Sequence, residues 1–153
     1  MNDLIIQKLN KQENLPWDLF LLADPSKKAI ENYLTNSEIY IAKMNEEIVG
    51  EFILTNISKD VVELKNIAVA KNQQGKGIGK QLVMKAIRVS KENGVKRIEV
   101  GTGNSSLNQL ALYQKCGFRI TGIDKDFFTK NYPEKIVENG IKCVDMIRLT
   151  IEF

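Results

Sequence analysis

The 153-residue sequence predicts an α/β fold, a single domain in which helices pack against a mixed β-sheet. Two observations lead to this prediction. Short runs rich in β-branched and aromatic residues are typical of strands, and they alternate with segments whose apolar residues recur at the three- and four-residue spacing of amphipathic helices. The clearest case is an apolar run that ends at Ala70, a glycine-rich turn, and a helix in which Ile78, Leu82 and Ala86 share one face.

Local signals set the limits of each element. Pro16 begins the first helix, Asp24-Pro25-Ser26 separates it from the second, and Gly94 has the place of a helix C-cap. Asn45-Glu46 and residues 58–60 are turns between strands. The predicted strands are residues 4–9, 38–44, 48–57, 61–70, 96–100, 118–123 and 143–151, and the predicted helices are residues 17–23, 27–34, 78–93 and 106–116. The chain thus has about seven strands and about four helices.

The strand at residues 61–70 contains an irregularity. Val62 and Leu64 share one face, whereas Ile67 and Val69 follow the other phase, so the alternation slips at Lys65-Asn66. A slip inside one strand predicts a β-bulge. The alternative is a strand that is buried on both faces at one end.

Residues 73–80 read Gln-Gln-Gly-Lys-Gly-Ile-Gly-Lys and form the turn between this strand and the next helix. Glycine lets backbone amides approach a ligand closely, and the first amides of a helix carry partial positive charge, so the turn is suited to a pyrophosphate. A Walker A loop is excluded because Gln81, not Ser or Thr, follows Gly79-Lys80. A dinucleotide fingerprint is excluded because the glycine spacing is one residue too short.

The pattern Gln74-x-x-Gly77-x-Gly79 instead resembles the coenzyme A pyrophosphate loop of the GNAT superfamily of N-acetyltransferases. A second block, Leu112-Tyr113-x-x-x-Gly117-Phe118, is similar to the other signature of that family, a helix end followed by a strand. The helix itself starts at Ser106, which with Gln109 has the spacing of a capping box. The resemblance covers about residues 38 to 123.

This resemblance implies a GNAT-type fold whose fourth strand is splayed from the fifth by the bulge, so that acyl-pantetheine enters between them. It implies direct transfer of an acetyl group from acetyl-CoA to a primary amine of an unidentified acceptor. The residues that it places at the cofactor are Ile67, Ala68, Val69, Gln74, Gly75, Lys76, Gly77, Ile78, Gly79, Lys80, Asn104, Ser106 and Tyr113. The chain departs from the family in one respect, because Ser106 stands seven residues before Tyr113, where many members have Asn.

Two residues are candidates for acid–base chemistry. By its position in the second block, Tyr113 is the candidate acid that protonates the departing thiolate; the alternative is a half-buried packing aromatic. The resemblance also implies a base: Glu63 stands six residues before Val69, where many members of the family carry a water-polarising Glu, and it is the candidate base, directly or through water. The alternative is a solvent-exposed strand glutamate. The backbone amides near Ile67 to Val69 can stabilise the developing negative charge on the carbonyl oxygen.

Residues 124–142 form a probable insertion between the last two strands, longer than a simple hairpin needs. Its aromatic residues Phe127, Phe128 and Tyr132 can form one wall of the acceptor pocket, or else a small satellite core under a long loop. Acidic and basic residues alternate in this segment, so it gives no specific support to a polycationic acceptor.

The composition and charge of the chain limit the other classes of protein to which it could belong. A net charge of +3 suits an anionic cofactor and does not argue for nucleic acid. No segment resembles a signal peptide or a membrane span, and Cys116 and Cys143 are isolated, so we expect a cytoplasmic protein with reduced thiols. The chain contains no histidine, and we expect no metal site. A homodimer is compatible with this class. The alternatives to an enzyme of this type are a CoA-binding regulatory module without turnover and, more remotely, a nucleoside-triphosphate enzyme.

Overall fold

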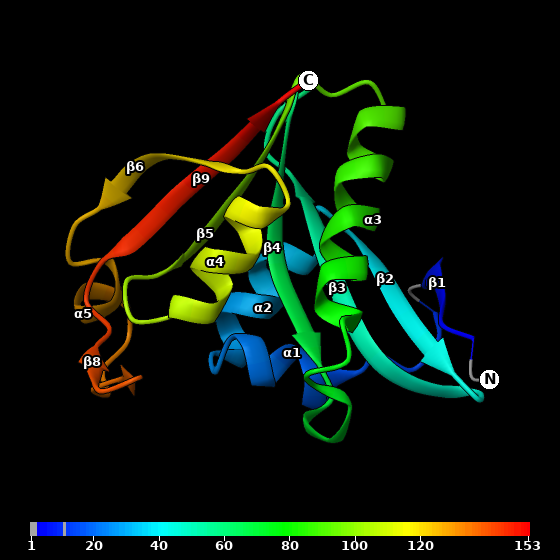
Figure 1. The fold of residues 1–153 in the computed structure, drawn as a ribbon, viewed down its shortest axis with the longest axis horizontal. Helices are drawn as coiled ribbons and strands as arrows, with labels where there is room; N and C mark the ends of the chain where they lie inside the picture. Colours follow the sequence, from blue (N-terminus) through cyan, green and yellow to red (C-terminus); the bar gives the residue numbers. More distant parts are fainter. Residues whose placement is uncertain (1–2, 11) are drawn as a thin grey trace.

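The computed structural model describes residues 3–10 and 12–153, and it confirms the mixed α/β prediction (Figure 1). Among these residues a seven-stranded sheet lies between helices, and a separate two-stranded hairpin is found near the C-terminal end of the chain. The elements in chain order are β1 (Ile5–Lys8), α1 (Trp17–Ala23), α2 (Lys27–Leu34), β2 (Ser37–Met44), β3 (Glu47–Asn56), β4 (Val61–Val69), the 3-10 helix η1 (Lys71–Gln73), α3 (Ile78–Glu92), β5 (Arg97–Gly103), α4 (Leu107–Lys115), β6 (Arg119–Asp124), α5 (Phe127–Asn131), β7 (Val137–Glu138), β8 (Ile141–Lys142) and β9 (Met146–Glu152).

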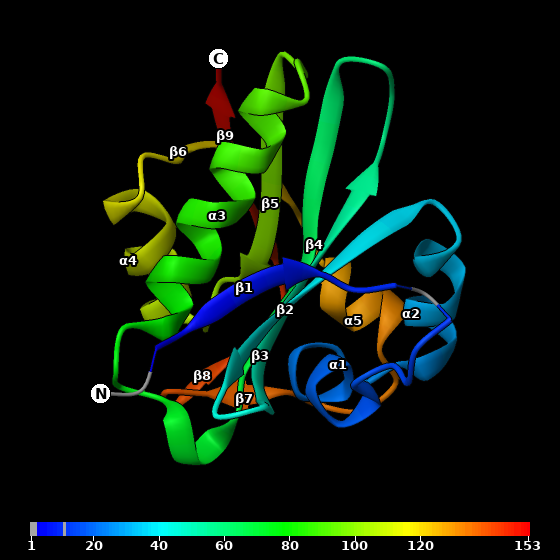
Figure 2. The ribbon, with the colours of Figure 1, turned by 90° about the vertical axis from the view of Figure 1, so that its right-hand side faces the viewer.

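The main sheet has the strand order β1-β2-β3-β4-β5-β9-β6, and β4–β5 is its parallel pair. Helix α3 connects these two parallel strands, as a parallel pair requires. Figure 2 shows the layers: α3 and α4 cover one face of the sheet, while α1, α2 and α5 lie on the other. In the part of the chain that the structure describes, no helix is long and apolar enough to cross a membrane.

Two apolar cores hold these layers together. The larger core packs α3 against the sheet and includes Phe52, Leu82 and Ile98, all with no exposed surface. The smaller core packs α1 and α2 on the opposite face and includes Phe20, Ile30 and Ile53. Because successive residues of a strand point to opposite faces, β3 supplies Phe52 to one core and Ile53 to the other.

The predicted bulge is present in β4. Asn66 pairs with Ile53, but the next pair along the ladder is Leu64 with Leu54, so Lys65 is the extra residue. Strand β4 pairs with β5 only up to Leu64, and residues 66–69 of β4 pair with β3 alone. Figure 1 shows the consequence: β4 and β5 run side by side near the C-terminus and then diverge.

The structure differs from the predictions at the end of the chain. Residues 124–142 are not a plain loop, because they contain α5 and the β7–β8 hairpin, so the described residues hold five α-helices rather than four.

The capping-box prediction for α4 is wrong: Ser106 does occupy the N-cap of α4, but its side chain makes no capping hydrogen bond and donates to Glu138 Oε1 at 3.0 Å. Gly117 ends this helix region with φ of +107°, as predicted.

Candidate active site

A groove of about 510 Å³ opens where β4 and β5 diverge. It brings together residues that lie far apart in the sequence, from α1, β4, β5, α4 and the 124–142 segment. Five predicted side chains, those of Glu63, Tyr113, Phe127, Phe128 and Tyr132, all line this groove. Of the predicted cofactor residues, Ile67, Ala68, Val69, Gln74 and Ser106 line it as well.

The glycine-rich loop lies at one end of the groove. Gly75 and Gly77 have φ of +79° and +82°, the left-handed region that favours glycine, and Gly77 is the N-cap of α3. A Cβ at either position would have no atom of another described residue, beyond its chain neighbours, within 4 Å, so the space beside these residues is open. The Nε2 atom of Gln74 donates to the Val69 carbonyl at 3.0 Å, which fixes the loop to the end of β4.

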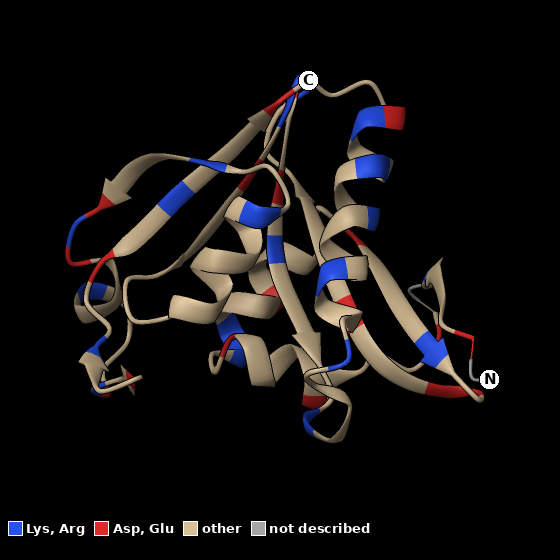
Figure 3. Cartoon of the chain, viewed as in Figure 1, with Lys and Arg blue, Asp and Glu red and all other residues tan. Residues whose placement is uncertain are grey.

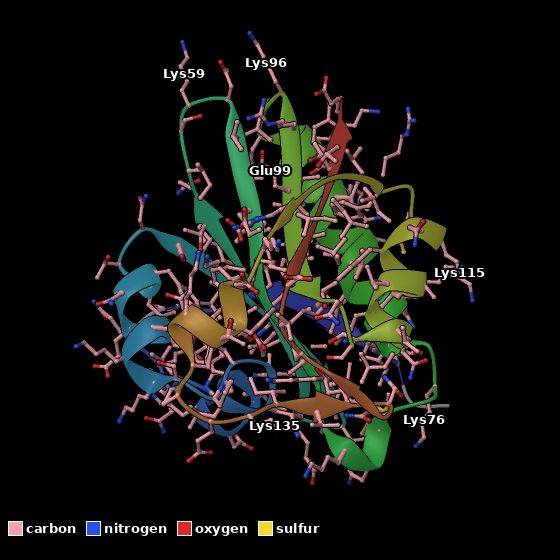
Figure 4. The ribbon with its side chains drawn as sticks, turned by 90° about the vertical axis from the view of Figure 1, so that its left-hand side faces the viewer. Lys59, Lys76, Lys96, Glu99, Lys115 and Lys135 are labelled. Atoms are coloured by element: carbon pink, nitrogen blue, oxygen red, sulfur yellow. The ribbon has the colours of Figure 1, made fainter. Side chains whose placement is uncertain are left out.

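The surroundings of this loop are basic. The first turn of α3 contains no acidic residue, and Lys and Arg residues recur along the helix (Figure 3). Figure 4 shows Lys76 at the opposite end of the molecule from Lys59 and Lys96. The end that carries Lys76 is the end toward which β4 and β5 separate. The Ile78 side chain belongs to the core, so this residue can face a ligand only through its backbone.

Tyr113 of α4 is almost fully buried, with 3% of its surface exposed. Burial raises the pKa of its phenol above the ordinary value of 10.0, so the hydroxyl stays protonated at neutral pH. The ring packs edge-to-face on Phe118 at 5.8 Å between centroids. Tyr113 is therefore a packing aromatic whose protonated hydroxyl belongs to a residue that lines the groove.

Glu63 is buried, not the solvent-exposed glutamate of the alternative interpretation. Its Oε2 atom lies 3.3 Å from Nη1 of Arg148 and 3.5 Å from Nζ of Lys65. Arg148 also donates from Nε to Asp124 at 2.9 Å. The carboxylate is thus held by cations on β9 and on the bulge, a feature that the apolar neighbours of Glu63 in the sequence did not indicate.

The aromatic residues of the 124–142 segment form one continuous wall. Phe127 and Phe128 pack edge-to-face at 5.1 Å, and Phe128 lies 5.7 Å from Tyr132 between ring centroids. The Tyr132 hydroxyl donates to Oδ1 of Asp24 at 3.0 Å, and that of Tyr33 donates to Oδ2 at 3.2 Å. Asp24 lines the groove but was predicted only as part of a turn between helices, because nothing local in the sequence indicates its partner at position 132.

Asn104 is not among the residues that line the groove. Its Oδ1 accepts from the amides of Val144 and Asp145 at 2.8 and 3.0 Å, and its Nδ2 donates to the Lys142 carbonyl at 3.1 Å. These three hydrogen bonds brace the chain between β8 and β9. Asn104 therefore stabilises the segment between β8 and β9, a role that the sequence did not predict.

Comparison with known proteins is consistent with this geometry. The model of the acetyltransferase (GNAT) family matches residues 7–118. The uncharacterized N-acetyltransferase YvbK of Bacillus subtilis (strain 168) is 52% identical over 136 residues, which cover 89% of this chain and 88% of that protein. A GNAT family acetyltransferase from Elizabethkingia anophelis, solved with acetyl-CoA bound, is 51% identical with a TM-score of 0.95 over 98% of each chain.

A Bacillus subtilis acetyltransferase solved in complex with CoA is also similar, with 48% identity, a TM-score of 0.94 and 99% of each chain covered. The match of the family model and the identity to relatives over nearly their whole length agree with the glycine loop and the splayed strands. The chain belongs to the acetyltransferase (GNAT) family and is an acetyl-CoA-dependent N-acetyltransferase.

Proposed function

We propose that this protein transfers an acetyl group from acetyl-CoA directly to a primary amine of its acceptor. The observation that carries the proposal is the departure of β4 from β5 after Leu64, which leaves one edge of residues 65–69 without a strand partner in the described chain. The groove at this gap is lined by Glu63 on one side and Tyr113 on the other. An extended ligand at the gap can pair with the free edge of β4 and pass between these two side chains.

The glycine loop supplies the site for the pyrophosphate. The backbone amides of residues 75–80 stand at the N-terminus of the 15-residue helix α3, where anions are favoured. The open space beside Gly75 and Gly77 admits a phosphate next to the backbone. We expect the pantetheine to follow Ile67 to Val69 and to pass Ser106, because all of these residues line the groove.

The acetyl-CoA molecule supplies the acetyl group and leaves as a thiol. An alkylamine, with a pKa near 10, is almost entirely protonated at neutral pH, so the acceptor must lose a proton before it reacts. Glu63 accepts this proton, directly or through water, and its cationic neighbours Arg148 and Lys65 hold the carboxylate in place. The free amides of β4 near Ile67 to Val69 face the charge that develops on the carbonyl oxygen. As the C–S bond breaks, Tyr113 donates its proton to the thiolate, and the second proton that the nitrogen sheds after forming the C–N bond restores the phenol.

The properties of the Cys143 thiol support direct transfer rather than a covalent acetyl-enzyme intermediate. Cys143 lines the groove and is the residue that a covalent route would use. Burial is the main cause that raises its pKa above 9.0, which disfavours the nucleophilic thiolate at neutral pH. Cys143 and Cys116 are both free, which fits our proposal that the protein acts in a reducing compartment such as the cytoplasm.

The test is a panel of primary amines assayed with acetyl-CoA by detection of the free thiol and by the mass of the product. We expect acetylation of at least one class of amine, intersecting rather than parallel double-reciprocal lines, and full activity in Cys143→Ser. Parallel lines with loss of activity in Cys143→Ser would show a covalent route instead. Tight binding of acetyl-CoA with no acceptor acetylated would leave a CoA-binding module.

A further inference from the structure

Glu51, in the middle of β3, has no exposed surface, and neither of its carboxyl oxygens has a hydrogen-bond partner among residues 3–10 and 12–153. The Oδ1 atom of Asn66 on β4 is also buried without a partner. Buried polar groups are nearly always hydrogen-bonded, because a group that loses water and gains no partner destabilises the folded state. Three acceptor oxygens without donors at one place therefore require an explanation.

Asn66 lines the groove, and Glu51 is its neighbour on the next strand of the sheet. Glu51 is the direct cross-strand partner of Ala68, and Asn66 is two residues from Ala68, so all three side chains share the face of the sheet that α1 covers. Diagonal neighbours on such a ladder lie about 7–8 Å apart or less, within reach of one bound group. Asn66 and Ala68 both line the groove, and the side chain of Ala68 is a single methyl group.

The amide of Asn66 is held in a fixed orientation. Its Nδ2 donates to the Phe20 carbonyl at 3.1 Å and to the Tyr33 hydroxyl at 3.1 Å, so both of its N–H groups are used within the protein. This orientation leaves Oδ1 as an acceptor without a donor in the part of the chain that the structure describes. The Glu51 side chain and Asn66 Oδ1 thus form a preorganised set of acceptors.

The charges around the groove also favour a cation. Its lining includes the carboxyl groups of Asp24, Glu63 and Glu138, but a single basic side chain, Lys65, among the described residues. Lys65 is already paired with Glu63. When Glu51 is ionised, its two oxygens and Asn66 Oδ1 are three acceptors, which match the three N–H donors of an ammonium group. Binding of the cation therefore displaces the proton that the buried carboxyl keeps in the free protein.

Building on the proposed transfer to an amine, we propose that Glu51 and Asn66 form an inner acceptor subsite, which binds a second ammonium or guanidinium group of a diamine-type acceptor. The reactive amine of such an acceptor lies near Glu63, and its second nitrogen group reaches the oxygens behind Ala68. The subsite selects acceptors by this distant group and takes no part in the acetyl transfer itself. An apolar side chain of similar size would leave no unpaired polar atom, so the buried carboxyl of Glu51 lowers the stability of the fold. We attribute the presence of Glu51 to acceptor binding and not to folding.

The test is isothermal titration of the CoA-bound protein with α,ω-diaminoalkanes of three to eight carbons, each compared with the n-alkylamine of the same length. We expect one diamine length to bind about tenfold or more tightly than its monoamine, the range of one charge-assisted hydrogen bond. Glu51→Gln should abolish this preference and leave monoamine binding within about twofold. Glu47→Gln, an exposed glutamate at the start of the same strand, is the control and should keep the preference.

A wild-type protein that binds no diamine better than its monoamine would overturn the subsite, as would an unchanged preference in Glu51→Gln. Thermal melting of Glu51→Leu distinguishes a role of Glu51 in acceptor binding from a role in folding. We expect an unchanged or higher Tm for this variant. A lower Tm, with the preference for the diamine over the monoamine intact, would assign the carboxyl to folding. Because binding is measured without turnover, the subsite and the transfer are tested separately. Diamine preference without acetylation of any amine would leave the subsite standing and remove the proposed transfer.

Discussion

The Tyr132 hydroxyl donates a hydrogen bond of 3.0 Å to Oδ1 of Asp24, across 108 positions of the chain. This contact ties the 124–142 segment to the turn between α1 and α2, so that the two segments face each other across the groove. Asp24 also accepts from the Tyr33 hydroxyl at 3.2 Å and from the Ser26 amide at 3.1 Å. This end of the groove is therefore bounded by a hydrogen-bonded network and not by loosely packed loops, and we propose that it binds the acceptor.

Removal of this contact should affect the acceptor and leave the cofactor alone. Tyr132→Phe loses the hydroxyl but keeps the ring that packs on Phe128. We expect a loss of about 1 kcal/mol in the free energy of unfolding and a higher KM for the acceptor, with the acetyl-CoA Kd unchanged. Chemical denaturation and steady-state kinetics measure these effects; unaltered acceptor kinetics would show that the aromatic wall serves stability only.

Tyr113→Phe tests the acid. The variant keeps the buried ring against Phe118, so the fold and acetyl-CoA binding should remain, while kcat falls by about 10²–10⁴. Because burial raises the pKa of Tyr113, its proton is retained as the pH rises, and the wild-type rate should show no loss from this group below about pH 10. A wild-type rate in Tyr113→Phe would reduce this residue to a packing role.

Asn104→Ala tests whether this side chain braces the protein or binds the cofactor. The change leaves the amides of Val144 and Asp145 without their acceptor, so we expect a loss of about 1–3 kcal/mol in the free energy of unfolding. The acetyl-CoA Kd should stay within about twofold. A large rise in Kd with little change in the melting curve would instead place Asn104 at the pantetheine.

Glu51 should make stability depend on pH in a defined direction. Burial raises the pKa of its carboxyl well above 4.5, so the folded protein retains a proton that the unfolded chain releases. The contribution of Glu51 is complete below the unfolded pKa, near 4.3, and is lost as pH rises toward the folded pKa, by up to about 1.4 kcal/mol per unit.

Melting curves of the wild type and Glu51→Gln from pH 4.5 to 7.5 measure this effect. We expect Glu51→Gln to gain stability relative to the wild type as the pH rises. Tyr33 of α2, whose pKa is raised chiefly by burial and slightly by Glu51, stays neutral across this range and does not confuse the comparison. Parallel curves for the two proteins would show that Glu51 is already ionised in the fold.

The features that could be predicted from the sequence are those with local causes. The glycine loop is one, because the left-handed φ of Gly77 and the helix N-terminus are properties of adjacent residues. The bulge at Lys65 is another, because a change in the alternation of one strand is visible without its neighbour. Helix and strand limits followed from caps and turns in the same way, and most agree with the structure within a few residues.

The features that could not be predicted depend on partners distant in the chain. Nothing near Asp24 indicates Tyr132, and nothing near Glu63 indicates that Arg148 would face it across 85 positions. The burial of Glu51 was equally hidden, since a glutamate within a strand is ordinarily placed toward solvent. The capping box failed for the same reason, because Ser106 found a partner in Glu138, 32 positions away.

The most direct test of the account is the acetyl-CoA affinity of Gly77→Asn compared with that of Gly94→Asn. Both glycines have φ near +80°, and within the described ranges no atom beyond their chain neighbours lies within 4 Å of a Cβ at either position. Because asparagine tolerates this conformation, both variants should fold with a similar small loss of stability. Gly77 begins α3 at the proposed pyrophosphate site, whereas Gly94 lies just beyond the other end of the same helix. By isothermal titration, we predict that Gly77→Asn weakens acetyl-CoA binding by at least about a hundredfold while Gly94→Asn leaves it unchanged. Equal, wild-type affinity in both folded variants would contradict the account.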